Sequence, residues 1–368
     1  MSRRARSDVS WAQALAWRLG RHHLAERAAP SDLVDVVGEI CGLHAQLMSS
    51  AELSVWTRIE GLERDAVHDA LWKRRRLVKL WGVRGTLHVL PAAELGIWLS
   101  ALGTYTNRGM TGHPEIDALT DAIGDALDGR ALTREELALE VETRTGDPKL
   151  AEYVRFSWGS YLKPASFRGL LCFAPSDDSR VRFTSPASFV RRRIVQPGSE
   201  EALREVTRRF LSAYAPATAE DLGLWSGFGR ARGAKMLAAL GDEAIELDVG
   251  GDRAWVLADD IAEIASAEPT DTARLLPAFD PWVVGTARYA PAQLDPAQKA
   301  RVFRPQGWIS PVLLVNGRMV GVWKHTRKGR RLDVELEPFG RLPRWARAQL
   351  EDEADRLAAF LGLDHPGG

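Results

Sequence analysis

Residues 218–257 read TAEDLGLWSGFGRARGAKMLAALGDEAIELDVGGDRAWVL and decide how the whole chain is interpreted. Thr218 and Asp221 have the spacing of a capping box that begins a helix. Gly227-Phe-Gly229 is typical of a turn, and a second helical stretch runs to Leu240. Two β-rich runs separated by a glycine pair then predict a hairpin. Helix, turn, helix and hairpin in this order predict a winged-helix unit.

The same order of elements occurs twice more toward the N-terminus. Thr133–Glu136 has capping-box spacing, Gly146-Asp147-Pro148 predicts a break before a second helix, and a hairpin is expected within Gly169–Thr184. A connecting helix is expected over Glu200–Tyr214. Before these, a hairpin broken by glycines is expected over Leu77–Leu90. Helices that precede this hairpin are expected to begin near Ser10, Ser31, Ser50 and Glu63, the last of them running to Arg75. Ser10 and Gln13 have capping-box spacing. Ser31 is expected to be an N-cap, and Gly42 to be the left-handed residue that ends the helix after it.

The C-terminal part differs from these repeats. Asn316-Gly317 lies between alternating apolar runs, which favours a type I′ hairpin. A basic turn over residues 324–331, a strand over Leu332–Leu336 and a helix over Pro343–Leu361 are expected to follow. We therefore predict an α+β protein with three tandem winged-helix units and a small C-terminal sheet-and-helix region. The ranges assigned to these parts are 1–128, 129–198, 199–270 and 271–368.

Composition limits the classes of function. The chain has 368 residues, 45% of them hydrophobic, which is enough for more than one core. Lys+Arg and Asp+Glu number 49 each, so a nucleic-acid interface would have to come from local patches. Cys41 and Cys172 are too far apart in sequence for a zinc motif, and we expect no metal and no cofactor. No segment resembles a signal peptide or a membrane span, so we expect a cytoplasmic protein with no membrane partner. We also expect a monomer.

Residues 41–50, CGLHAQLMSS, lie between two of the expected helices and contain a candidate site. If these residues are extended, His44 and Gln46 point to the same side. An imidazole and a carboxamide can together accept a proton from water and donate a hydrogen bond, as metal-free hydrolysis requires. The alternative, which is more common for a lone histidine, is a hydrogen-bonding group at a helix end. His22 and His23 are expected at the surface.

Several stretches resemble a known family, the bacterial winged-helix DNA glycosylases typified by AlkZ and YcaQ. They are Gly42–Gln46, Arg84–His88, Leu275–Gly285 around Phe279-Asp280-Pro281, and Ser310–Trp323. The resemblance covers essentially the full length. It implies three tandem winged helices that form a positively charged DNA channel. It also implies excision of alkylated purines, including bulky adducts and crosslinks left by genotoxic natural products, in some members as self-resistance.

The family's catalytic motif is Gln–apolar–Gln in AlkZ-like members and Gln–apolar–Asp in YcaQ-like members. The matching positions here are His44, Ala45 and Gln46, so His44 replaces the first Gln and Gln46 keeps the second. The chain is thus similar to a His–apolar–Gln variant within the AlkZ-like branch. The resemblance implies a monofunctional glycosylase in which neutral His44 accepts the proton of water and Gln46 orients that water. No lysine lies near His44 in sequence, so a Schiff-base lyase is not expected, although Lys73 and Lys79 could approach His44 in space. The alternatives are a non-enzymatic winged-helix regulator and a protein that binds a toxin adduct without cleaving it.

Double-stranded DNA containing alkylated purines is the expected partner. Cationic runs are expected to bind its phosphates, with solvated surface as the alternative. The residues of these runs are Lys73, Arg74, Arg75, Arg76, Arg191, Arg192, Lys324, Arg327 and Lys328, with Lys163 and Arg168 as weaker candidates. Arg84, Thr86 and His88 match the family's pattern near the site, although His88 could be a hydrogen-bonded strand residue. Asp280 is expected either to orient a site residue or to cap a turn.

Overall fold

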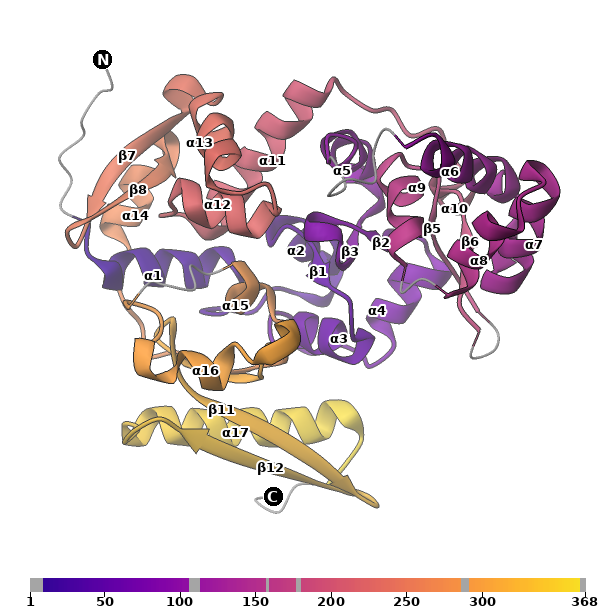
Figure 1. Cartoon of the computed structure of the whole chain (residues 1–368). Coiled ribbons are helices and arrows are strands. Elements are labelled where there is room, and N and C mark those ends of the chain that lie inside the picture. The colour runs from indigo at the N-terminus through magenta and orange to yellow at the C-terminus, as the bar shows by residue number, and fades with distance from the viewer. Residues whose placement is uncertain (1–8, 106–112, 157–158, 177–179, 286–290, 365–368) are drawn as a thin grey trace. The chain divides into compact units, whose positions relative to one another are not determined.

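The computed structural model describes residues 9–105, 113–156, 159–176, 180–285 and 291–364 (Figure 1). The chain forms two compact units: unit 1 comprises Met1–Val67 and Thr207–Gly368, and unit 2 comprises His68–Val206. The chain leaves unit 1 after Val67 and returns to it at Thr207, within helix α11 (Ser199–Tyr214). Helices and small antiparallel sheets occur throughout, which confirms the α+β class. The boundaries of these units, after Val67 and after Val206, fall inside two of the four predicted ranges, 1–128 and 199–270. The four ranges stay a prediction.

In unit 1, helix α1 (Trp11–Arg21) begins at the predicted capping box of Ser10 and Gln13. Helix α2 (Leu33–Glu39) does not begin as predicted. Ser31 lies inside a preceding 3-10 turn and its hydroxyl donates to the Asp32 carboxylate at 2.8 Å, so it caps no helix. The expectation that Ser31 is an N-cap was therefore wrong, because Pro30 places the turn before the helix.

The end of α2 is as predicted. Gly42 has φ 90°, and its N–H donates to the Val37 carbonyl oxygen at 2.8 Å, so a left-handed residue closes the helix. The short strand β1 (Leu43–His44) follows, and helix α3 (Met48–Trp56) begins at Met48 rather than at Ser50.

The third predicted helix pair is present in unit 1. Helix α12 (Ala219–Ser226) begins at the Thr218 capping box, and helix α13 (Arg230–Ala238) follows it. The two helices pack so closely that a Cβ on Gly233 would lie 2.3 Å from the Ala219 carbonyl oxygen. The hairpin of β7 (Ala244–Val249) and β8 (Asp252–Leu257) completes the predicted order, and α14 (Ile261–Ser266) follows. Naming this part a winged helix remains our interpretation.

The C-terminal part of unit 1 contains a four-stranded sheet in the order β12-β11-β10-β9. Asn316 (φ 49°) and Gly317 (φ 77°) join β10 to β11, as the sequence predicts. The expected basic turn over residues 324–331 was wrong in extent, because strand pairing continues to Lys328 opposite Arg331 and only two residues turn. The strands are β9 (Ala273–Leu276), β10 (Val312–Val315), β11 (Arg318–Lys328) and β12 (Arg331–Pro338).

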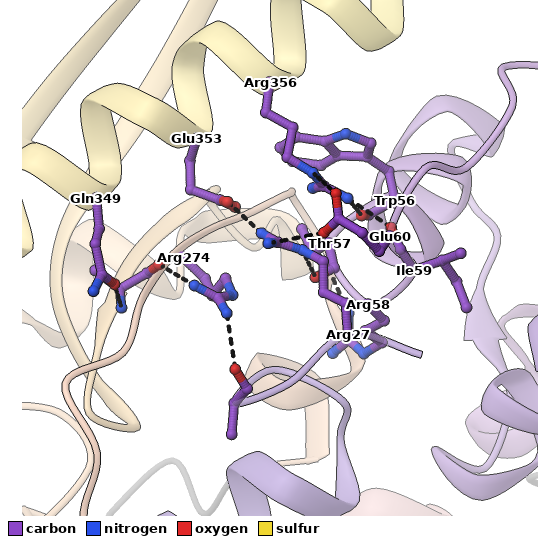
Figure 2. Close-up of polar contacts among 12 residues, drawn as sticks. Arg27, Trp56, Thr57, Arg58, Ile59, Glu60, Arg274, Gln349, Glu353 and Arg356 are labelled. Atoms are coloured by element: carbon purple, nitrogen blue, oxygen red, sulfur yellow. Dashed lines mark hydrogen bonds and ion pairs between the residues drawn. The ribbon is translucent and has the colours of Figure 1, made fainter. Parts of the chain in front are cut away.

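Helix α17 (Arg344–Leu361) packs against strands β9 and β12 of this sheet (Figure 1). Its polar side chains reach the segment that ends α3. Arg356 donates to the carbonyl oxygens of Trp56 and Ile59 at 3.0 and 2.6 Å, and Glu353 forms an ion pair with Arg27 (Figure 2). The last helix of the chain is therefore fixed to residues near its beginning.

One apolar cluster supports this part of the fold. Trp282, fully buried in α15 (Pro281–Gly285), packs with Leu19 of α1, Val312 of β10 and Val302 of α16 (Lys299–Val302). Burial of such side chains is the main favourable contribution to folding. The remaining 3-10 turns of unit 1 are η6 (Gly241–Glu243), η7 (Ala258–Asp260), η8 (Pro296–Gln298) and η9 (Pro305–Gly307).

Unit 2 contains the second predicted helix pair. Helix α7 (Arg134–Thr145) begins at the Thr133 capping box and ends at Gly146 (φ 67°), and α8 (Pro148–Phe156) follows. A three-stranded sheet in the order β4-β6-β5 contains the predicted hairpin. Its strands are β4 (Ala131–Thr133), β5 (Cys172–Ala174) and β6 (Arg182–Thr184).

The other predicted hairpin of unit 2 joins β2 (Leu77–Trp81) to β3 (Leu87–Pro91). The single helix expected from Glu63 to Arg75 was wrong, because a short α4 (Ala66–His68) continues into the π-helical turn η2 (Asp69–Lys73). The remaining elements are η3 (Val83–Gly85), η4 (Ala92–Glu94), α5 (Leu95–Leu102), α6 (Pro114–Leu127), η5 (Ser160–Leu162), α9 (Lys163–Phe167) and α10 (Pro186–Val190).

Within the described ranges, no helix is long and apolar enough to cross a membrane. Over the same ranges, no group of three or more His, Cys, Asp or Glu residues could hold a metal ion.

Candidate functional site

His44 ends strand β1 and is nearly buried, with 8% of its surface exposed. Its ring stacks on Phe279, with ring centroids 4.8 Å apart and an interplanar angle of 9°. Regular strand ends at His44 and the chain bends at Gln46, whose side chain is exposed. The two motif residues therefore differ in environment: His44 is enclosed by protein, while Gln46 faces solvent.

Phe279 is held in an unusual backbone conformation. Its φ of 59° is in the left-handed region, which a bulky residue rarely adopts. The next residue, Asp280, is fully buried and accepts a hydrogen bond from the Trp282 N–H at 2.9 Å at the start of α15. This cap fixes the backbone directly after Phe279, and with it the ring against which His44 packs.

The Asp280 carboxylate also binds Arg58. Both side chains are fully buried, and the two Arg58 Nη atoms donate to the two carboxylate oxygens at 2.8 Å each. Arg58 Nη1 also donates to the Ser54 carbonyl oxygen at 2.7 Å and to the Thr57 hydroxyl at 2.9 Å. Bidentate, charge-assisted pairs of this kind are the strong ones. Asp280 thus caps a helix and connects it to the end of α3.

Sequence analysis did not find Arg58, because its partner lies 222 residues away along the chain. Nothing in the sequence around Arg58 marks it as buried. The signal that could have suggested the pair is the Phe279-Asp280-Pro281 stretch, where a carboxylate lies among apolar residues and needs a partner if it is buried.

His22 is not at the surface, contrary to the expectation. It is fully buried, its Nε2 lies 3.0 Å from the Ala213 carbonyl oxygen, and its ring contacts Tyr214 and Trp282 edge-on at 5.1 Å each. Burial, followed by the charges of Arg58 and Arg18, lowers the pKa of His22 well below its ordinary value. His22 is therefore neutral and acts as a packing group. His23 Nε2 lies 2.5 Å from a carboxylate oxygen of Glu39.

Trp308 lies at the solvent-exposed end of the site. It contacts Phe279 edge-on, with centroids 5.1 Å apart and an interplanar angle of 75°, and 41% of its surface is exposed. His44, Phe279 and Trp308 form what we call the aromatic row, which leads from a nearly buried imidazole to an exposed indole. Sequence analysis did not single out Trp308, since tryptophan is frequent in this chain.

In unit 2, the residues that match the family's pattern cluster around the β2–β3 hairpin. The Thr86 hydroxyl donates to the Val83 carbonyl oxygen at 3.0 Å, and His88 Nδ1 lies 3.0 Å from the Thr86 carbonyl oxygen. Arg84 has φ 60°. The side chain of Lys163 lies against Gly85, where an added Cβ would be 3.3 Å from Lys163 Cδ. The structure therefore brings Lys163 to the turn that carries Arg84.

Several predicted DNA-binding cations of unit 2 have protein partners. Lys73 forms an ion pair with Asp69 at 2.8 Å, and Arg168 forms one with Asp121 at 2.8 Å. Two arginines donate to backbone carbonyl oxygens, Arg75 to Phe189 at 3.1 Å and Arg192 to Ala92 at 2.9 Å. The other members of these runs, Arg74, Arg76 and Arg191, are exposed.

The predicted cations of the C-terminal hairpin also have acidic neighbours. Lys324 lies 3.0 Å from Glu335 and 3.3 Å from Glu337, and hydrogen bonds to these carboxylates raise its pKa. Lys328 lies 2.8 Å from Asp333. The remaining cation, Arg327, donates through Nε to the Gly329 carbonyl oxygen at 3.0 Å. Positive and negative groups therefore alternate across this hairpin.

A basic pocket in unit 2 includes three cations that were not predicted to bind DNA. Lys73 lines it together with Lys79, Arg180 and Arg182. Burial lowers the pKa of Lys79, whose ammonium group lies 5.3 Å from the centre of the Phe173 ring. These residues are far apart in sequence and meet only through the packing of the hairpin strands.

Comparison with known proteins gives consistent matches. The family model described as DNA glycosylase AlkZ-like matches residues 37–360. An "Interstrand DNA cross-link repair glycosylase" from Streptomyces sahachiroi is 35% identical over 367 residues, covering 96% of this chain and 97% of that protein. The solved structure of Streptomyces sahachiroi DNA glycosylase AlkZ has 34% identity and a TM-score of 0.87, covering 98% of this chain and 99% of that one.

Proposed function

The chain belongs to the AlkZ-like DNA glycosylase family, and we propose that it hydrolyses the N-glycosidic bond of N-alkylated purines with His44 and Gln46. Membership makes it an enzyme that cleaves the bond between base and sugar, which decides against a non-enzymatic regulator. The observation that carries the proposal is the pairing of an enclosed, stacked His44 with an exposed Gln46 in the family's motif.

The chemistry of an alkylated purine suits these two residues. Alkylation at guanine N7 or adenine N3 leaves a positive charge on the base, which then departs readily as the sugar gains oxocarbenium character. The enzyme must place a water at C1′ and accept its proton. Neutral His44 accepts that proton, and Gln46, which cannot ionise, orients the water. No covalent intermediate is required, so the reaction is monofunctional.

Asp280 and Arg58 support this site through Phe279. The buried ion pair fixes the start of α15, and Phe279 directly before it holds the His44 ring on one face. A fixed ring is an advantage for a general base, because catalysis depends on the position of the accepting nitrogen. We assign Asp280 and Arg58 as positioning residues.

DNA binding is assigned to the cationic residues already described. Cations that are paired with carboxylates would exchange these partners for phosphates when DNA binds. Binding to the phosphates releases their counterions and makes the affinity salt-dependent. Exposed ion pairs contribute little to stability, so this exchange costs little. The residues are Lys73, Arg74, Arg75, Arg76, Arg84, Thr86, His88, Lys163, Arg168, Arg191, Arg192, Lys324, Arg327 and Lys328.

The name of the Streptomyces relative supports a wider substrate range. That protein is described as an interstrand DNA cross-link repair glycosylase. We propose that this chain, too, acts on bulky adducts or crosslinks left by genotoxic natural products, as a self-resistance enzyme. It would do so as a cytoplasmic monomer, with ranges 1–128, 129–198, 199–270 and 271–368 as its functional parts.

The test uses a DNA duplex carrying a single N7-methylguanine. After incubation with the enzyme, strands are resolved with and without alkali, which cuts at abasic sites. We expect cleavage only after alkali. His44→Ala should abolish it while DNA affinity stays nearly unchanged, and Gln46→Ala should lower the rate by about 100-fold or more. Loss of DNA binding together with activity in His44→Ala would reject the assignment, as would strand cleavage without alkali.

A further inference from the structure

We propose that Trp308 is a specificity-determining residue that recognises the cationic, flat face of an alkylated purine. This inference rests on the proposed function and adds the group that distinguishes a damaged base from a normal one. It starts from the position of Trp308, which is the exposed end of the aromatic row that begins at His44.

The loop that carries Trp308 is closed and supported. Its ends are paired, because Phe303 and Ile309 form an antiparallel bridge and the Ser310 N–H donates to the Val302 carbonyl oxygen at 2.9 Å. Inside it, the Arg304 N–H donates to the Trp308 carbonyl oxygen at 2.8 Å. A large aromatic residue on such a loop is presented to solvent with little conformational freedom left to lose on binding.

The apolar cluster beneath the loop also supports the catalytic part of the row. Val302 and Ile309, which flank the loop, belong to the same buried cluster as Phe279 and Trp282. The position of Trp308 relative to Phe279, and so to His44, is therefore set by a shared core. A base whose sugar carbon lies beside His44 would come within reach of the indole.

The charge of the substrate explains why an indole is useful here. A tryptophan ring carries negative potential on its face and attracts cations more strongly than other aromatic side chains. A purine alkylated at N7 or N3 is a flat cation, whereas an undamaged purine is neutral. Stacking alone does not distinguish them, since every base has an aromatic face. Stacking on Trp308 adds an electrostatic preference for the damaged base.

The experiment measures discrimination rather than affinity alone. The probes are two duplexes of one sequence, one containing N7-methylguanine on a 2′-fluoroarabino sugar, which resists hydrolysis, and the other guanine on the same sugar. Binding is measured by fluorescence anisotropy for the unmutated protein, Trp308→Leu and Trp308→Phe. The matched control is Phe156→Leu, which removes an aromatic residue that is 77% exposed elsewhere in the chain. Thermal unfolding verifies that each variant is folded.

We expect Trp308→Leu to reduce the affinity ratio between damaged and undamaged duplex by about fivefold, Trp308→Phe to reduce it less, and Phe156→Leu to leave it unchanged. An unchanged ratio in Trp308→Leu would overturn the proposal, and so would an equal loss of affinity for both duplexes, which would indicate a general DNA contact. Excision of N7-methylguanine from a normal deoxyribose by the unmutated protein tests the proposed function separately. If excision occurs, failure of the Trp308 proposal leaves the proposed function intact. If it does not, the proposed function itself fails.

Discussion

The Asp280 carboxylate has two roles, since it caps helix α15 and forms an ion pair with Arg58. Asp280→Asn should lower the free energy of unfolding by about 3–5 kcal/mol, because it leaves the buried guanidinium without its counter-charge. Denaturant unfolding measures this loss. The double variant Arg58→Met/Asp280→Leu should recover much of the stability, because apolar replacement of a whole buried pair is often tolerated.

The same double variant separates positioning from stability. If the pair positions Phe279 and His44, excision by the double variant should stay at least about tenfold slower at saturating substrate, with DNA affinity little changed. Activity that returns together with stability would show that the pair is merely structural. Single-turnover rates on the N7-methylguanine duplex give the comparison.

His22 links stability to pH. Its pKa is lower in the folded state than in the unfolded chain, so below a pH of about 6.5 the unfolded chain binds more protons. The free energy of unfolding should therefore fall as the pH drops from 6.5 toward 5, by up to about 1.4 kcal/mol per unit from this group. His22→Phe should show a flatter profile, and His68→Gln, which removes an exposed histidine, should not. Equal slopes in all three proteins would contradict this.

At the scale of single elements, helix α7 offers a direct test of local sequence signals. Its capping box satisfies backbone N–H groups that would otherwise lack partners, so Thr133→Ala should lower the free energy of unfolding by about 1 kcal/mol. Thr143, exposed within the same helix, donates to the Leu139 carbonyl oxygen and caps no helix end. Thr143→Ala should be neutral or stabilising in the same urea titration. A similar loss in both variants would mean that the cap is not the cause.

Elements with local signals could be predicted from the sequence. The capping boxes at Ser10, Thr133 and Thr218 and the Asn316-Gly317 turn are all where the sequence places them, because their hydrogen bonds join residues a few positions apart. Ser31 shows the limit of prediction from local signals, because a 3-10 turn that begins at Pro30 lies where the N-cap was expected. The prediction that His22 lies at the surface was wrong, because its burial depends on Tyr214 and Trp282, which are distant in sequence.

For the site, sequence analysis located the motif but not its surroundings. His44 and Gln46 were singled out from the local sequence and again through the family resemblance, and Asp280 through the resemblance alone. Arg58 and Trp308 were not, because their significance depends on contacts with Asp280 and Phe279, each formed by folding. Sequence pattern carries no information on which of many arginines or tryptophans will meet a given partner.

For the whole molecule, equal numbers of positive and negative residues mean that DNA affinity depends on local cations. Arg74→Gln should lower the slope of log affinity against log salt by about 0.9, as expected for one lost phosphate contact, and by the same amount for any DNA sequence. Arg253→Gln is the matched control, because Arg253 is exposed and lies outside the proposed interface. Anisotropy titrations at several salt concentrations measure this slope. An unchanged slope for Arg74→Gln would exclude a contact between Arg74 and a DNA phosphate.

The division of unit 1 into two sequence segments affects the order of events during synthesis. His44 leaves the ribosome early, but Phe279, Asp280 and Trp308 follow much later, and Arg356 of α17 binds the segment after α3 only near the end. The proposed site is thus completed only after Trp308 and Arg356 have been made. A nascent or prematurely terminated chain would carry the motif without the partners that we propose position it. On the proposed function, such a chain would not release bases from the host's own DNA.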